Sequence, residues 1–293
     1  MAERKPLDAQ AFALMLALTA LWGFQQVAIK LTAPDVSLVM QAALRTALAA
    51  ALLVAWARWR GIALLSRDGT LAAGLAAGLL FGLEFVFIYA GLGHTAASRM
   101  TVFIYLAPVL TALGLHWLVP GEKLARAQWL GVGVAFAGIA LAFGEAFAAA
   151  RSSLLGDFFG LVAAVLWAAT TVLIRATSLS RATAAKTLFY QLAVAAPLLL
   201  AASLLMGEKG VVALTPLALA SLAYQGVIVA FASYLAWFWL LTRYLAARLS
   251  VFSFMTPLFG VLAGVVVLGE PLTPSFVGAA LLVGAGIVLV NRR

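Results

Sequence analysis

The stretch ASRMTVFIYLAP at residues 97–108 returns as AARLSVFSFMTP at residues 246–257, 149 positions later. Both copies carry an arginine in third place, a central Val-Phe pair and a final proline. Further landmarks recur in the same order at offsets of 145 to 148: WGFQQVAIK (22–30) with WAATTVLIR (167–175), Gly121-Glu122 with Gly269-Glu270, and Gly138-Ile139 with Gly286-Ile287. Because unrelated apolar segments would not keep one order and one spacing, the chain is predicted to contain an internal duplication.

The sequence around these landmarks is far more apolar than that of a soluble domain. Of the 293 residues, 65% are hydrophobic and 10% are charged, with a mean hydropathy of +1.10, whereas soluble domains carry roughly 25% charged residues. The apolar runs reach the ~20 residues that a helix needs to cross a bilayer, and they show no barrel-like alternation. They predict an all-α integral membrane protein with ten transmembrane helices, at residues 9–31, 36–59, 70–92, 96–118, 126–146, 154–176, 183–206, 214–241, 246–269 and 273–291.

Each copy of the repeat holds five predicted spans. Since five is an odd number, the second copy must enter the membrane from the opposite side and lie inverted relative to the first. We place the two repeats at residues 1–148 and 149–293. Inverted repeats are typical of secondary transporters, whose solute site lies near the bilayer midplane between the halves.

The distribution of basic residues indicates an orientation. Lys and Arg number 19 against 10 Asp and Glu, a net charge of +9. These residues are dispersed between apolar runs without a basic stripe, so nucleic-acid binding is not expected. With a cytoplasmic N-terminus, 14 of them fall on the inner side and 4 on the outer side, while Arg45 lies within a span. This bias favours cytoplasmic placement of both termini. The first apolar run, from about residue 9 to 29, is too long for the core of a cleaved signal and is interpreted as the first span.

The sequence lacks the residues that several kinds of chemistry require. The chain has no cysteine, which excludes disulfides and thiolate metal sites, and His94 and His116 have no evident companion ligands. We therefore expect neither a metal nor a cofactor. No span carries an aspartate pair or a histidine cluster, which makes an intramembrane enzyme improbable. A Gly-x-x-x-x-Gly-Lys loop, which ATP-driven pumping requires, does not occur in the sequence.

Together with the duplication, a set of motifs resembles the drug/metabolite transporter superfamily, in its EamA branch. The motifs are Trp22-Gly23, Leu44-Arg45, the run from Tyr89-Ala-Gly-Leu to Ala97-Ser, Pro108 and Pro257, and the Gly-Glu pairs at 121–122 and 269–270. The resemblance covers nearly the whole chain. Within the branch, the chain is similar to exporters of aromatic amino acids. The resemblance implies efflux of amino acids or related metabolites across a bacterial inner membrane.

Two ionisable residues lie inside predicted spans, where they are costly and are therefore candidates for function. Arg45 lies near the middle of the second span and Glu84 in the middle of the third, so a direct ion pair is geometrically feasible. Two interpretations stay open. The pair can be a structural clamp between the helices, or Glu84 can act as a protonatable or amine-binding site beside Arg45.

Polar, aromatic and bulky residues form stripes at helical spacing, and their repeat equivalents do the same. Such faces turn away from lipid and suit an apolar or aromatic solute. The candidate solute-binding residues are Trp22, Gln25, Gln26, Arg45, Glu84, Ile88, Thr101, Tyr105, Trp167, Thr171, Ser233 and Trp237. Tryptophans near span ends have the alternative role of an interfacial belt, which we assign to Trp56, Trp59, Trp117 and Trp129.

Prolines and glycines within spans carry structural expectations. Pro108 and Pro257 each remove a backbone hydrogen bond at equivalent points of the two repeats, so they are either hinges for alternating access or static kinks. Glycines at four-residue spacing, Gly74, Gly78 and Gly82 together with Gly260 and Gly264, predict close helix packing.

The favoured function is a secondary exporter of amino acids, aromatic or hydrophobic ones, and related metabolites. The expected partners are a small-molecule substrate and the lipid bilayer, and we expect a monomer. A carrier of phosphorylated solutes or nucleotide sugars is the alternative. It ranks lower because a dianionic phosphate requires several buried cations, and only Arg45 lies well inside a span. Uniport, exchange and proton antiport all remain open.

Overall fold

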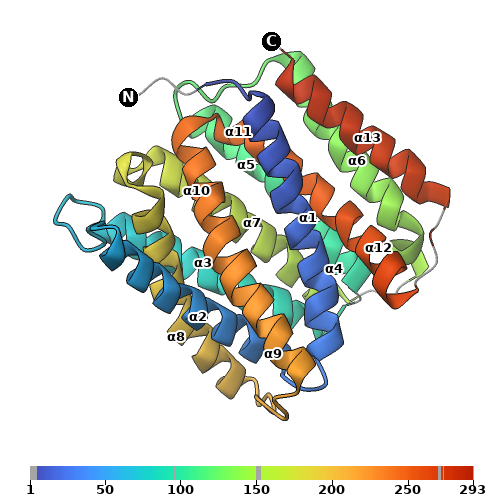
Figure 1. The fold of residues 1–293 in the computed structure, drawn as a ribbon. Coiled ribbons are helices and arrows are strands. Elements are labelled where there is room, and N and C mark those ends of the chain that lie inside the picture. The colour runs from blue at the N-terminus through green and yellow to red at the C-terminus, as the bar shows by residue number, and fades with distance from the viewer. Residues whose placement is uncertain (1–4, 96, 150–152, 270–271, 273, 293) are drawn as a thin grey trace.

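The computed structural model describes residues 5–95, 97–149, 153–269, 272 and 274–292, and its helices account for the ten predicted spans. Seven spans are single helices from end to end, and the fourth, eighth and ninth are assembled from shorter pieces (Figure 1). The elements are α1 (Ala9–Thr32), α2 (Leu38–Trp59), α3 (Leu71–Leu92), α4 (Ala97–Ile104), α5 (Ala107–Leu118), α6 (Arg126–Ala149), α7 (Leu154–Ala176), η1 (Ser178–Arg181), α8 (Ala184–Leu205), α9 (Pro216–Ala223), η2 (Tyr224–Ser233), α10 (Tyr234–Arg243), α11 (Ala246–Ser250), η3 (Val251–Phe254), α12 (Met255–Leu268) and α13 (Pro274–Asn291).

The fourth and ninth spans break at equivalent places, just before their prolines. Span four stops at Ile104 and restarts as α5 at Ala107, and span nine passes through the 3-10 turn η3 into α12. Pro108 and Pro257 were expected in the interior of continuous helices. Instead each lies in the first turn of a new helix. Backbone N–H groups in the first turn have no intrahelical acceptor, so a proline there costs no hydrogen bond.

Contacts between helices recur in pairs, as two inverted repeats require. The first span packs on the ninth through α1 and α12, and the sixth packs on the fourth through α7 and α5. Likewise α3 packs on α8, and its counterpart η2 packs on α2. The fifth and tenth spans, α6 and α13, pack along each other at one side of the molecule (Figure 1).

Glycines permit the closest of these contacts. A Cβ atom on Gly74 would lie 2.2 Å from the Tyr190 ring, and one on Gly78 would lie 2.6 Å from the Tyr190 carbonyl, so α3 and α8 meet as the four-residue spacing predicts. At the contact of α1 with α12, a Cβ on Gly23 would lie 2.6 Å from the backbone nitrogen of Gly260. Any larger side chain would separate these helices.

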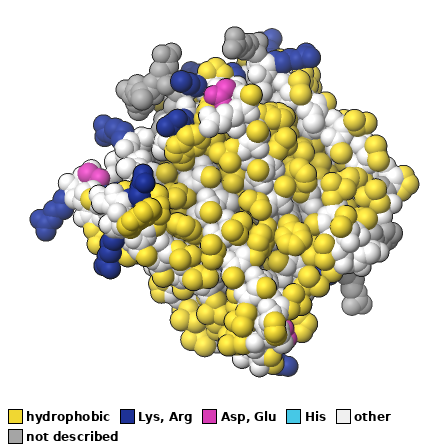
Figure 2. Space-filling view, in the orientation of Figure 1, with side chains coloured by type: hydrophobic (Ala, Val, Ile, Leu, Met, Phe, Trp, Pro, Cys, Tyr) yellow, Lys and Arg dark blue, Asp and Glu magenta, His cyan; other side chains and the backbone are white. Residues whose placement is uncertain are grey.

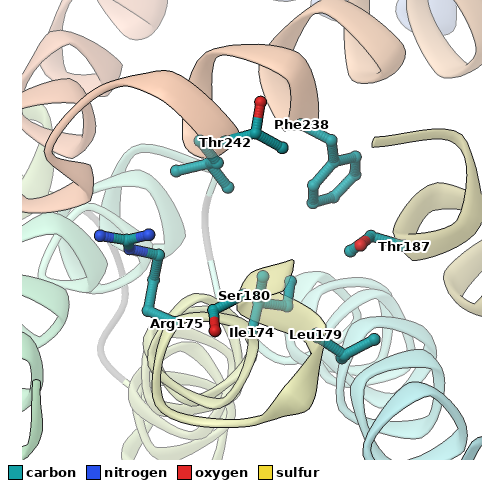
Figure 3. Close-up of a pocket in the computed structure, with 8 residues that line it drawn as sticks. Ile174, Arg175, Leu179, Ser180, Thr187, Phe238 and Thr242 are labelled. Carbon is teal, nitrogen blue, oxygen red and sulfur yellow. The ribbon is translucent and has the colours of Figure 1, made fainter. Parts of the chain in front are cut away.

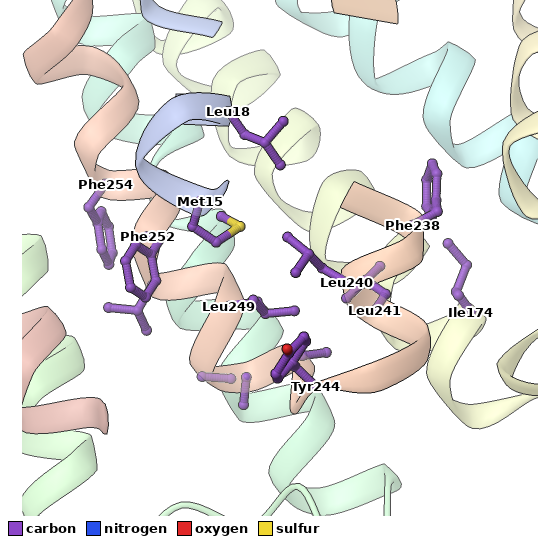
Figure 4. Close-up of a cluster of buried hydrophobic side chains, with 14 of the residues drawn as sticks. Met15, Leu18, Ile174, Phe238, Leu240, Leu241, Tyr244, Leu249, Phe252 and Phe254 are labelled. Carbon is purple, nitrogen blue, oxygen red and sulfur yellow. The ribbon is translucent and has the colours of Figure 1, made fainter. Parts of the chain in front are cut away.

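The outer surface is that of a membrane protein. Large apolar side chains stand exposed along the spans, and the space-filling view is dominated by them, with Lys and Arg gathered toward one end (Figure 2). Both termini lie at that end (Figure 1). Beneath it, apolar side chains of α1, α7, α10, α11 and η3 pack into a buried cluster (Figure 4), which includes Met15, Leu18, Ile174, Phe238, Leu249 and Phe252.

Candidate solute-binding site

Three predicted site residues meet where α1 approaches the eighth span. The Trp22 ring contacts the Trp237 ring edge-on, with centroids 5.9 Å apart, and lies 6.3 Å from the ring of Tyr234. The indole Nε1 of Trp22 donates a hydrogen bond of 2.8 Å to the Ser233 hydroxyl, which in turn donates to the carbonyl of Val229. This chain of hydrogen bonds ties an aromatic side chain of the first repeat to the backbone of the second.

The backbone that positions Ser233 is unusual. Residues 224–233, the element η2, form a π-helix of ten residues, in which each turn holds more residues than an α-helical turn. Such segments are rare and occur frequently at functional sites, because they shift the side chains that follow. Ser233 ends this segment, and Tyr234 and Trp237 follow it directly.

Arg45 lies buried beside the same aromatic side chains, with 2% of its surface exposed. Its Nη1 approaches the hydroxyl of Tyr234 at 3.5 Å, and its guanidinium lies over the Phe85 ring, 4.9 Å from the centroid. Its Nε is buried and has no hydrogen-bond partner. The guanidinium therefore lies among aromatic rings with hydrogen-bonding capacity unused.

Glu84 is also buried, with 7% of its surface exposed, but its carboxylate is not within ion-pair distance of Arg45. The direct ion pair that the sequence made feasible does not form, because the Arg45 side chain is directed to Tyr234 and Phe85. The geometry therefore does not support a structural clamp between α2 and α3 formed by an ion pair of Arg45 with Glu84.

A second cluster joins the fourth and sixth spans. Tyr105 and Trp167 contact each other edge-on at 5.9 Å. The Tyr105 hydroxyl lies beside Thr256 of α12, whose own hydroxyl is buried without a hydrogen-bond partner. Tyr105 and Trp167 are thus brought together, as the stripes predict, with a buried hydroxyl nearby.

The other predicted residues have varied surroundings. Gln25 and Thr171 are buried, whereas Gln26 is exposed and Ile88 is partly buried. The hydroxyl of Thr101 donates to the carbonyl one turn earlier in its own helix and does not reach either aromatic cluster. Gln26 and Thr101 therefore have weaker structural support than the residues of the two clusters.

Two aromatic residues of the site were missed. Tyr234 and Phe85 both contact Arg45, and they lie 149 positions apart, the offset that relates the fourth span to the ninth. The signal was present as two aromatic residues directly after the paired positions Glu84 and Ser233. Extending the predicted stripe by one residue would have found both.

At the end that carries the termini, a buried ion pair connects the two repeats. Glu122, in the loop between α5 and α6, binds the guanidinium of Arg175 at the end of α7. The same carboxylate accepts hydrogen bonds from the backbone nitrogens of Ala246 and Ala247, at 3.0 and 3.1 Å, where α11 begins. The repeat equivalent of Glu122, Glu270, lies outside the described residues.

A small cavity of about 10 Å³ adjoins this ion pair (Figure 3). Arg175 faces it together with Thr187 of α8 and Phe238 of α10, and the Nη1 of Arg175 has no hydrogen-bond partner. The cavity is about the size of one water molecule.

Two further basic residues, each in the first turn of a helix, are also paired. Arg99 forms an ion pair with Asp157, to which Thr95 also donates a hydrogen bond. Lys186 binds Asp68 at 2.7 Å in the loop between α2 and α3. The Lys186 ammonium holds the pKa of the Asp68 carboxyl well below its usual range.

Comparison with known proteins identifies the class of protein that this fold and these sites define. The model of the EamA-like transporter family matches residues 10–144 and again residues 154–292, so the chain belongs to that family and carries its domain twice. A transporter of Archaeoglobus fulgidus is 29% identical over 287 residues, covering 96% of this chain and 97% of that protein. The transporter YvbV of Bacillus subtilis is 28% identical over 215 residues, covering 73% of this chain and 68% of that protein.

One relative has a more specific name. A protein of Salmonella typhimurium named "Probable amino-acid metabolite efflux pump" is 25% identical over 283 residues, covering 94% of this chain and 93% of that protein. A solved crystal structure with 22% sequence identity superposes with a TM-score of 0.81, covering 96% of this chain and 97% of the other. The superposition supports the fold, and the family identifies a multi-pass membrane transporter.

Proposed function

We propose that the protein exports amino acids, aromatic or hydrophobic ones, across a bacterial inner membrane by alternating access. The observation that carries the proposal is the buried guanidinium of Arg45, which lies among aromatic rings without a carboxylate at ion-pair distance. A cation inside a membrane protein is costly unless an anion can join it. The carboxylate of an amino acid supplies that anion, and the name of the Salmonella relative agrees with this substrate class.

Each part of such a substrate has a matching group in the proposed site. Arg45 binds the carboxylate by hydrogen bonds that strengthen in this water-poor setting. Glu84 binds the ammonium group, since its carboxyl group is buried and it directly precedes Phe85, whose ring lies against the Arg45 guanidinium. Trp22 and Trp237 then contact an apolar or aromatic side chain.

Alternating access follows from the duplication. Two inverted repeats, at residues 1–148 and 149–293, give two related packings that open on opposite sides of the membrane. The helix breaks before Pro108 and Pro257 are the hinges in this proposal, because they interrupt the hydrogen-bond ladder at equivalent places. Replacing either proline with alanine should slow transport several-fold while leaving the affinity for substrate unchanged.

A carrier of phosphorylated solutes has weaker support. The buried cations Arg99, Arg175 and Lys186 each bind an acidic side chain of the protein, which leaves Arg45 as the buried cation nearest the aromatic clusters. One guanidinium does not balance a dianionic phosphate.

The test is transport by purified protein in liposomes, with phenylalanine, leucine, a quaternary amine and a sugar phosphate compared with and without a proton gradient. We expect transport of the two amino acids, and we expect Arg45→Ala to abolish it, with Arg45→Lys restoring part of the activity. Glu84→Gln should weaken amino-acid transport while preserving binding of a carboxylate that lacks the amine. Folded yield and thermal stability serve as controls. Transport of the sugar phosphate alone, or normal amino-acid transport by folded Arg45→Ala, would overturn the proposal.

Orientation is tested separately. Because the chain has no cysteine, single-cysteine variants report on one site each. In intact cells, Lys209→Cys should react with a membrane-impermeant maleimide, and Arg126→Cys should react only after permeabilisation. The reverse pattern would place the termini outside.

A further inference from the structure

A groove of about 620 Å³ opens among the membrane spans, apart from the aromatic clusters of the candidate site. Residues of η2 and α10, including Phe231 and Trp239, supply the largest share of its lining. Leu14 of α1 and Trp56 of α2 contribute to it from neighbouring spans. The lining is almost entirely apolar.

The groove lies at one end of the spans, close to the level of the lipid head groups. Its polar lining residues, Gln10 and Thr183, lie at the beginnings of α1 and α8, at the end of the molecule that carries the termini. Trp239, which also lines it, is in the last turns of α10. One end of the groove is therefore polar and near the membrane surface, whereas the remainder is apolar and at the depth of acyl chains.

Two arginines lie close to residues that line or flank the groove. The guanidinium of Arg243 lies over the ring of the groove residue Trp239, 4.3 Å from its centroid. The guanidinium of Arg60 lies 5.9 Å from the centroid of the Trp59 ring, and Arg60 comes two residues before the groove residue Ile62. In the part of the chain that the structure describes, neither arginine is paired with a carboxylate.

The nearby acidic residues make contacts elsewhere and do not pair with these two arginines. Asp8 accepts hydrogen bonds from the backbone of Ala11 and from the Tyr244 hydroxyl, and Asp68 binds Lys186. The space-filling view shows Lys and Arg gathered beside the apolar face at this end of the molecule (Figure 2). Charge complementarity therefore favours an anion at the polar end of the groove.

We propose that this groove binds an anionic phospholipid, with an acyl chain against Trp56, Phe231 and Trp239 and the phosphate held by Arg60 and Arg243. Apolar surface at membrane depth is filled by acyl chains, and basic residues at the surface between spans bind anionic head groups. The bound chain contacts α10, whose Trp237 belongs to the candidate solute site. This inference rests on the membrane placement of the spans and not on the substrate or direction of transport.

The test uses quenching of tryptophan fluorescence by brominated lipid. Purified protein is reconstituted in phosphatidylcholine containing a rising mole fraction of brominated phosphatidylglycerol or brominated phosphatidylcholine. Trp56 and Trp239 lie in the groove and report its occupancy. We expect a component quenched at a several-fold lower mole fraction of phosphatidylglycerol than of phosphatidylcholine. Each arginine should contribute about fivefold to this preference, which corresponds to ~1 kcal/mol per cation near the membrane surface.

Variants distinguish the groove from the rest of the surface. Arg60→Gln with Arg243→Gln should abolish the preference, and Trp56→Phe with Trp239→Phe should remove the selectively quenched component. Ala236→Phe, which fills the groove, should do the same in a protein with both arginines intact. Arg126→Gln is the matched control, since this arginine is exposed at the start of α6 and does not line the groove. The proposal would be overturned by equal quenching with the two lipids, or by an effect of Arg126→Gln equal to that of the Arg60→Gln and Arg243→Gln substitutions. It would also be overturned if an apolar amino acid displaced both lipids and neither lipid were preferred.

Discussion

The buried carboxylate of Glu122 offers a sharp test of how the two repeats are held together. Its side chain is 1% exposed and that of its partner Arg175 is 3% exposed. Glu122→Gln keeps the size of the side chain and removes the charge. The variant leaves the Arg175 guanidinium buried without an anion, and the amide group cannot accept hydrogen bonds from both Ala246 and Ala247.

The expected cost follows from these contacts. Removing one partner of a buried ion pair destabilises a protein by about 3–5 kcal/mol, and an orphaned buried N–H costs about 1–3 kcal/mol, part of which is already included in that figure. We therefore expect Glu122→Gln to lower the free energy of unfolding by about 3–5 kcal/mol. For a chain of this size, the melting temperature should fall on the order of 10 °C.

The assay is thermal unfolding of purified protein in dodecyl maltoside, followed by intrinsic fluorescence. The control is Lys123→Gln, since Lys123 is exposed and directly follows Glu122 in the sequence. It should leave the melting temperature unchanged. Arg175→Met should cost less than Glu122→Gln, because the carboxylate keeps its two backbone donors. Combining the two substitutions should cost less than the sum of the single variants. A melting temperature for Glu122→Gln within 2 °C of wild type, or strictly additive effects, would refute the reasoning.

Two further outcomes follow from single contacts. Because Lys186 holds the pKa of Asp68 below its usual range, the stabilisation from this ion pair is complete above about pH 4 and is lost as the pH falls further. Asp68→Asn should therefore flatten the dependence of the melting temperature on acid pH. An unchanged pH profile of the melting temperature would contradict this expectation. At the contact of α1 with α12, Gly23→Leu should destabilise by about 1–3 kcal/mol, because its Cβ would lie 2.6 Å from Gly260. Gly133→Leu, where a Cβ meets no atom within 4 Å, should be close to neutral in the same melting assay.

The spans and their duplication were predictable because hydropathy and repeat spacing are properties of the chain itself. The interaction of Arg45 was not, since the rotation of α2 about its axis and the reach of a long side chain depend on tertiary packing. The π-helix that positions Ser233 and Trp237 leaves no distinctive residue pattern in YQGVIVAFAS (224–233). The prolines indicated a discontinuity in spans four and nine, but not its form: span four stops at Ile104 and restarts at Ala107, whereas span nine passes through a 3-10 turn.

The two repeats are alike in fold and unequal in charge, and this inequality bears on mechanism. Each first helix supplies a tryptophan that contacts an aromatic residue of the other repeat, as Trp22 does with Trp237 and Trp167 with Tyr105. The positions 145 to 149 residues after Arg45 read YQLAV, and those after Glu84 read VAFAS, without a charged residue in either. Both buried charges of the candidate site therefore belong to the first repeat. In the proposed transport cycle, the charged groups of an amino acid stay bound to the first repeat while the second moves around its side chain. The inward-open and outward-open sites would then share Arg45 and Glu84 and differ in their aromatic contacts, so Trp237→Ala should change the selectivity among side chains more than Arg45→Lys does.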